Sequence, residues 1–153
     1  MRISAKTDYA IRAAAELAGA TGDGWTRTES VAQAQGIPLP FLLNILAELR
    51  SASLVTSRRG VEGGYRLARP AEAISVADVI RAVDGPLANI AGSRPEDLTY
   101  SGAAAPLRDT WVALRAQMRS VLERVTLADL VKGELPAEVT DLLDDQGAWK
   151  ARR

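Results

Sequence analysis

Apolar residues recur at helical spacing in three places within the first 86 residues. Alanines and leucine at this spacing predict a helix over about residues 4–19, with Ser4 or Thr7 placed to cap its start. A second stripe at positions i, i+3, i+4 and i+7 is formed by Leu42, Ile45, Leu46 and Leu49. A third has the same spacing and is formed by Val76, Val79, Ile80 and Val83. Each stripe predicts an amphipathic helix with one buried face.

A shorter helix is predicted directly before the second stripe. Thr26 and Glu29 have the T-x-x-E spacing of a capping box, and Gly36 is a typical stop. Pro38 and Pro40 fit only before or within the first turn of the next helix. A short helix, a tight turn and a longer amphipathic helix are typical of a helix-turn-helix.

A glycine-rich hairpin is predicted to follow, with strands at 54–55 and 65–67 around the segment SRRGVEGG. These glycines match no phosphate-loop spacing, and no helix follows them, so a nucleotide cradle is disfavoured. We interpret the hairpin as a wing. Its glycines permit a sharp tip with amides open to phosphates, and its arginines suit a narrow DNA minor groove.

A heptad pattern over residues 106–125 is the other informative feature. Its positions are spaced 4, 3, 4, 3, 4 and are Leu107, Trp111, Leu114, Met118, Val121 and Val125. An ordinary core helix and a helix pair across a dimer interface both produce this pattern. The chain is therefore expected to be mainly α with a small β-hairpin. We divide it into a winged helix-turn-helix (1–86), a loop (87–105), and a dimerisation helix with a peripheral C-terminal tail (106–153).

Composition narrows the chemistry. Among 153 residues there is no cysteine and no histidine, which excludes disulfides, thiolate metal sites and imidazole catalysis. No pair of acids stands in a recognisable motif, so we expect no catalytic residues and no enzyme. No apolar run has membrane-spanning length and no signal-type segment is seen, so a cytoplasmic protein without a membrane partner is expected.

Charge is balanced in total but not along the chain. There are 19 basic and 19 acidic residues; residues 1–70 hold nine basic and six acidic, and residues 71–153 hold ten basic and thirteen acidic. The N-terminal half therefore has a net charge of +3, which favours contact with a polyanion.

Three segments together resemble the Rrf2 family of bacterial winged-helix transcription regulators: 9–18, 29–70 and 74–86. Three patterns carry the resemblance in combination: G-I-x-x-x-F-L, L-V-x-S-x-R-G-x-x-G-G-Y-x-L and I-x-x-x-D-V-I-x-A-V-D-G-P. It implies a homodimer on a pseudo-palindromic operator of double-stranded DNA, which represses or activates nearby genes; we expect repression. The alternative is a protein-interaction or small-molecule sensor module whose DNA binding is controlled by a partner enzyme or metabolite.

The resemblance also implies which residues meet DNA. The start of the recognition helix would face the major groove and a wing arginine the minor groove; in this sequence these residues are Leu39, Pro40, Phe41 and Asn44, with Arg59 in the wing. The expected DNA-binding set further includes Arg2, Arg58, Gly60, Gly63, Gly64 and Tyr65. Pro40 replaces a small polar residue common in the family and Phe41 a frequent tyrosine, so two hydroxyls are missing. Base reading should then depend on Asn44, apolar contact and DNA shape.

The family's best-known branch binds an iron–sulfur cluster through three cysteines in the loop before the long helix. The corresponding loop here, 87–105, has none. We therefore expect no metal and no cofactor, with the dimer seam formed by the six heptad residues.

Overall fold

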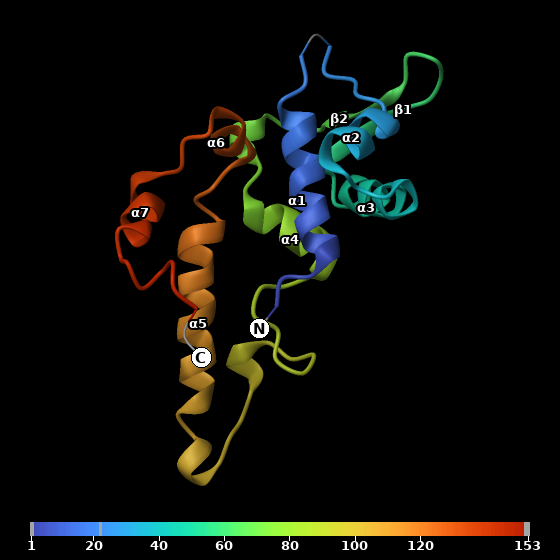
Figure 1. The fold of residues 1–153 in the computed structure, drawn as a ribbon. Coiled ribbons are helices and arrows are strands. Elements are labelled where there is room, and N and C mark those ends of the chain that lie inside the picture. The colour runs from blue at the N-terminus through green and yellow to red at the C-terminus, as the bar shows by residue number, and fades with distance from the viewer. Residues whose placement is uncertain (1, 22, 152–153) are drawn as a thin grey trace.

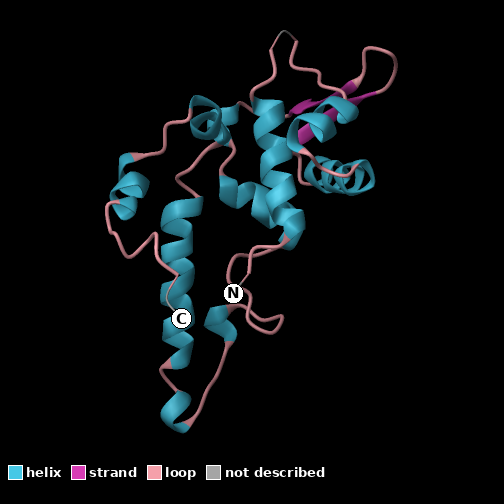
Figure 2. Cartoon of the chain, viewed as in Figure 1, coloured by secondary structure: helices cyan, strands magenta, loops and turns pink. Residues whose placement is uncertain are grey.

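The computed structural model describes residues 2–21 and 23–151. Helices dominate, and one antiparallel hairpin is the only sheet among these residues (Figures 1 and 2). The expected mainly α fold with a small hairpin is confirmed. The elements are α1 (Ala5–Ala18), α2 (Thr28–Gln35), α3 (Leu39–Ser51), β1 (Val55–Arg58), β2 (Gly64–Leu67), α4 (Val76–Asp84), α5 (Leu107–Leu122), α6 (Leu127–Lys132) and α7 (Ala137–Thr140).

Helix α1 is the centre of the core and contacts α2, α3, α4 and α6. Its buried face is made of small residues, Ala10, Ala13 and Ala14, together with Leu17. Alanine side chains let neighbouring helices approach closely. The four-residue stripe of α3 is fully buried against this face, and burying each such side chain contributes roughly 1.5–3 kcal/mol.

Helices α2 and α3 form the predicted helix-turn-helix. Helix α2 ends at Gly36, whose φ of 61° and ψ of 37° are left-handed and favour glycine. The pair is bent by 116°, within the range of roughly 90–120° usual for this motif. Among the residues that the structure describes, no single helix is long and apolar enough to cross a membrane.

The predicted capping box at Thr26 and Glu29 is wrong. Helix α2 begins at Thr28, after an N-cap, Arg27, that makes no side-chain capping bond. The backbone of Thr26 is used elsewhere: its N–H donates to the carbonyl of Tyr65 at 2.9 Å and its carbonyl accepts from the N–H of Tyr65 at 2.8 Å. Thr26 is thus an extended third segment beside the hairpin.

The chain returns to the first domain after α5, so the expectation of a peripheral tail is wrong for residues 127–132. Ser75 and Thr126 form a β-bridge, and each starts its helix, α4 and α6, with a full capping box. Leu127 is 0% exposed and belongs to the main core cluster. Helix α6 packs on α1 because Leu127 and Ala128 give it an apolar side.

Helix α5 extends away from this core (Figure 1) and has no buried residue along its length. Its heptad positions from Leu107 to Val121 are only partly buried. Val125, the last position of the predicted seam, differs: it lies beyond the end of α5 and is 6% exposed, packed with Val76 and Val139 of the same chain. The seam available to a partner therefore ends at Val121.

Candidate nucleic-acid interface

The recognition helix presents its predicted residues to solvent. The buried stripe fixes how α3 is rotated, so the first turn faces outward: Leu39, Pro40 and Asn44 are all exposed. Phe41 is 61% exposed, so its ring is not part of the core. Leu43 is also exposed, and no sequence pattern singled it out. An apolar and amide surface of this kind can contact thymine methyl groups and adenine edges in a major groove.

The wing is a tight hairpin whose shape depends on its glycines. Arg58 pairs with Gly64 at the end of the ladder, and Gly60 turns the chain with a φ of 106°. The N–H of Gly63 donates to the carbonyl of Gly60 at 3.0 Å. The amide of Gly63 is therefore used within the turn, and its contact with a phosphate stays a prediction.

Trp25 braces the wing from the side. The guanidinium groups of Arg58 and Arg66 lie 4.6 Å and 4.4 Å from its ring centroid, in cation–π geometry. Arg58 also donates from Nε to the carbonyl of Glu62 at 3.2 Å and pairs with Asp23 at 3.7 Å. Arg58 is thus held by the protein itself. Sequence reasoning missed Trp25, because a lone aromatic in a loop belongs to no period.

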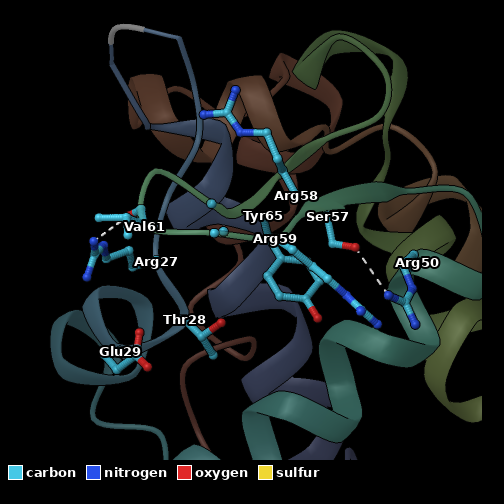
Figure 3. Close-up of a pocket in the computed structure, with 12 residues that line it drawn as sticks. Arg27, Thr28, Glu29, Arg50, Ser57, Arg58, Arg59, Val61 and Tyr65 are labelled. Carbon is cyan, nitrogen blue, oxygen red and sulfur yellow. Dashed lines mark hydrogen bonds between the residues drawn. The ribbon is translucent and has the colours of Figure 1, made fainter.

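Arg59 is the arginine at this tip that is free to reach a ligand. It is exposed and makes no hydrogen bond or ion pair with the residues that the structure describes. Its side chain extends past Tyr65 toward the end of α3 (Figure 3). There Arg50 donates from Nη1 to Ser57 Oγ at 3.1 Å, which ties α3 to the wing.

A basic groove of about 500 Å³ lies between these elements. The wing forms one wall, the start of α2 contributes Thr28 and Glu29, and the end of α3 contributes Arg50 (Figure 3). Its walls carry four arginines, Arg27, Arg50, Arg58 and Arg59, against one carboxylate. Arg27 donates to the carbonyl of Val61 and so holds the tip beside α2. A cleft with this charge attracts phosphates.

Tyr65, Gly60, Gly63 and Gly64 also line this groove, whereas Arg2 does not. Arg2 lies at the other end of α1 and lines a cavity with Leu87 and Met118. The structure therefore brings the predicted wing residues together, places the residues of α3 on the neighbouring helix, and separates Arg2 from both.

Known proteins with similar sequences are transcription regulators. Rv1287, a candidate HTH-type transcriptional regulator of Mycobacterium tuberculosis, is 52% identical over 153 residues, which is 100% of this chain and 95% of that protein. The HTH-type transcriptional regulator CymR of Bacillus subtilis is 34% identical over 130 residues, covering 85% of this chain and 89% of CymR.

Solved structures give the same result for the fold. CymR, described as the global cysteine regulator of B. subtilis, has a TM-score of 0.73 at 32% identity, covering 86% of this chain and 97% of that one. IscR of T. potens has a TM-score of 0.68 at 31% identity, covering 100% and 94%. The family model for Rrf2, an iron-dependent transcriptional regulator, matches residues 3–133. With its winged helix, basic groove and relatives, this chain belongs to the Rrf2 family of DNA-binding transcription regulators.

Proposed function

We propose that the chain binds a pseudo-palindromic operator as a homodimer and represses the adjacent genes. The observation that supports a dimer is the exposure of α5. None of its sixteen residues is buried, and its heptad seam is partly exposed. Pairing two such helices would bury the seam from Leu107 to Val121 in knobs-into-holes contacts. Two wings and two recognition helices would then meet one duplex, and the linked half-sites raise effective affinity.

Each half-site is read by the two surfaces that flank the basic groove. Asn44 on the exposed side of α3 would bond an adenine edge, and Phe41 beside it would contact a thymine methyl group. Arg59 would enter the adjacent minor groove, where narrow A·T-rich sequence has the most negative potential. Arg27, at the start of α2, and Arg50, at the end of α3, would contact phosphates.

An operator titration of Arg59→Ala tests this arrangement, with the chain's own upstream DNA as probe. Loss of one base- or groove-specific arginine costs roughly 1–3 kcal/mol per half-site. Arg69→Ala is the matched control, because Arg69 is exposed just after the hairpin and outside the groove. Equal losses in the two variants would mean that only net charge matters, and the assigned role of Arg59 would be wrong.

Sedimentation of Met118→Glu tests the dimer. A carboxylate in the seam would be buried without a partner, so the variant should be monomeric at concentrations where wild type is dimeric. Gln117→Glu adds the same charge one residue away on the exposed side of α5 and should stay dimeric. A monomeric wild type at micromolar concentration would contradict the proposal.

We also propose that this member works without an iron–sulfur cluster. The family model is described as iron-dependent, but cluster irons are held by cysteine thiolates or histidines, and this sequence has neither. Within residues 2–21 and 23–151, no group of three or more acidic, cysteine or histidine side chains is placed to hold a metal ion. Purified protein should therefore bind operator equally with and without a chelator, and a chelator-dependent affinity would contradict this.

A further inference from the structure

Four arginines line a second cavity, far from the wing, where α4, the loop after it and α5 meet. We name it the arginine pocket. Its volume is about 470 Å³, enough for a small metabolite. Glu96 is the one carboxylate among its described lining residues, and Gly85, Pro86 and Leu87 complete its wall. The arginines are Arg81 of α4, Arg94 of the loop, and Arg115 and Arg119 of α5.

The ion pairs around the pocket leave positive charge over. A single carboxylate, Glu123, serves both Arg81 and Arg119, the latter at 3.8 Å. Glu96 pairs with Arg115. The side chain of Arg94 makes no ion pair or hydrogen bond with the residues that the structure describes.

Asp78 is the remaining acid that forms an ion pair with one of the four arginines. Its Oδ1 lies 3.6 Å from Arg81, but its other oxygen caps α4 through Ser75. Counting Asp78, Glu96 and Glu123 against four guanidinium groups leaves one net positive charge. Each guanidinium has five N–H donors in a planar fork, and these pairs occupy only part of them.

The pocket is also partly shielded from water. The side chain of Arg115 is only 15% exposed, so charge there is less screened than on an open surface. The carboxyl of Glu96 accepts a hydrogen bond from backbone N–H and another from Arg115, and both hold its pKa below the ordinary value. Glu96 therefore stays ionised at neutral pH, and the excess positive charge remains after it is counted.

We propose that the arginine pocket binds a small polyanionic metabolite, a phosphate ester or a polycarboxylate with at least two negative charges. Planar guanidinium forks match phosphate and carboxylate oxygens in bidentate geometry. Arginines from three segments converge there, so one ligand with several oxygens can bridge them all.

A ligand bound in the arginine pocket would affect the DNA-binding surface through the position of α4. Helix α4 carries Arg81 and packs on α1 and α3, whereas Arg115 and Arg119 belong to the proposed dimer helix. A ligand that joins these arginines holds α4 in one position relative to α5 and so favours one spacing of the two recognition helices. This regulatory role rests on the proposed function; the binding site itself does not.

Calorimetric titration of the full chain without DNA tests the site. Inorganic pyrophosphate and citrate are the two probes, at constant low ionic strength, and they distinguish phosphate from carboxylate ligands. We expect saturable binding of one probe molecule per chain, weakened roughly tenfold in Arg94→Gln and in Arg119→Gln, the scale of one lost charge-assisted contact. Arg94→Gln breaks no ion pair of the fold, so it separates ligand binding from stability.

Arg108→Gln is the matched control, because Arg108 is on α5 but outside the pocket and pairs with Asp109. It should bind the probe as wild type does. No saturable binding of either probe, or the same weakening in Arg108→Gln as in Arg94→Gln, would overturn the site.

Operator titration with and without the bound probe tests regulation. Wild-type operator affinity should change several-fold, and Arg94→Gln should need roughly ten times the probe concentration for the same change. Direct competition at the wing would instead leave the response of Arg94→Gln equal to that of wild type. Pyrophosphate or citrate bound in the pocket with unchanged operator affinity would overturn the effector role. A chain that binds the probe but no operator would support the site while refuting the proposed function.

Discussion

Replacing Gly64 with alanine would push a methyl group into the backbone of Thr26. A Cβ on Gly64 would lie 2.6 Å from the carbonyl carbon of Thr26 and under 3.0 Å from its oxygen. Backbone cannot move aside as a flexible side chain can, so the extended segment at Thr26 must separate from β2. The φ of Gly64, +144°, is also one that L side chains rarely adopt.

Two contributions set the size of the effect. Backbone strain at a disfavoured φ costs about 1–3 kcal/mol. The two hydrogen bonds between Thr26 and Tyr65 contribute about 0.5–1.5 kcal/mol each. Gly64→Ala should therefore destabilise by about 2–6 kcal/mol. Gly60→Ala is the matched control, because Gly60 has a φ of +106° but nothing within 4 Å of its Cβ position, so only the strain applies.

Urea unfolding at one fixed protein concentration measures the free-energy difference, since oligomers gain stability with concentration. Hydrogen exchange at the amides of Thr26 and Tyr65 reports local opening of the wing. We expect the free energy of unfolding of Gly64→Ala to be about 1–3 kcal/mol lower than that of Gly60→Ala, which is the contribution of the two hydrogen bonds. The amides of Thr26 and Tyr65 should both lose their protection against hydrogen exchange. If the free energies of unfolding of the two variants differ by less than about 0.5 kcal/mol and the amide of Thr26 keeps its protection, the idea that the segment at Thr26 stabilises the wing is refuted.

Three further results are expected. Trp25→Ala should weaken operator binding several-fold with little change in global unfolding, because two exposed cation–π contacts of about 0.5–1 kcal/mol each order the wing; Trp25→Phe, titrated in parallel, should retain most of the affinity. Leu127→Ala should cost about 2–5 kcal/mol in urea unfolding, the usual cost of a core cavity, whereas a peripheral helix would lose under about 1 kcal/mol. Hydrogen bonds from the backbone and side chain of Thr126 lower the pKa of Asp129 from its ordinary 3.8. This contribution is therefore complete at neutral pH and disappears as pH falls through the lowered pKa. The stability gap between wild type and Asp129→Asn should be constant above about pH 5 and shrink below 3.8; a gap that widens in acid would contradict it.

The helices could be predicted because their signals are local. The stripes of α3 and α4 each depend on residues within two turns, and both helices form where expected, with Ile80 of α4 half-buried. Thr26 misled because the T-x-x-E pattern is also local, while the competing bonds come from Tyr65, 39 residues later in the sequence.

The parts that could not be predicted all depend on distant contacts. Leu127 looked peripheral, since nothing in its neighbourhood reveals that the chain returns to Ile74, whose carbonyl accepts from the N–H of Leu127 at 2.9 Å. The arginine pocket has the same origin: Arg81 and Arg115 are 34 residues apart in sequence, and only the fold brings them to one cavity. The distinction between Arg58 and Arg59 likewise required Trp25 to be placed beside the first and not the second.

The β-bridge between Ser75 and Thr126 brings together the two ends of the segment that runs from α4 through α5. Truncation between α5 and α6 would therefore not give a smaller DNA-binding protein. It would remove Leu127 and Ala128, which pack against α1, and expose the core. A shortened version of the DNA-binding domain should keep residues 126–132 and replace the segment between α4 and Thr126 with a short turn.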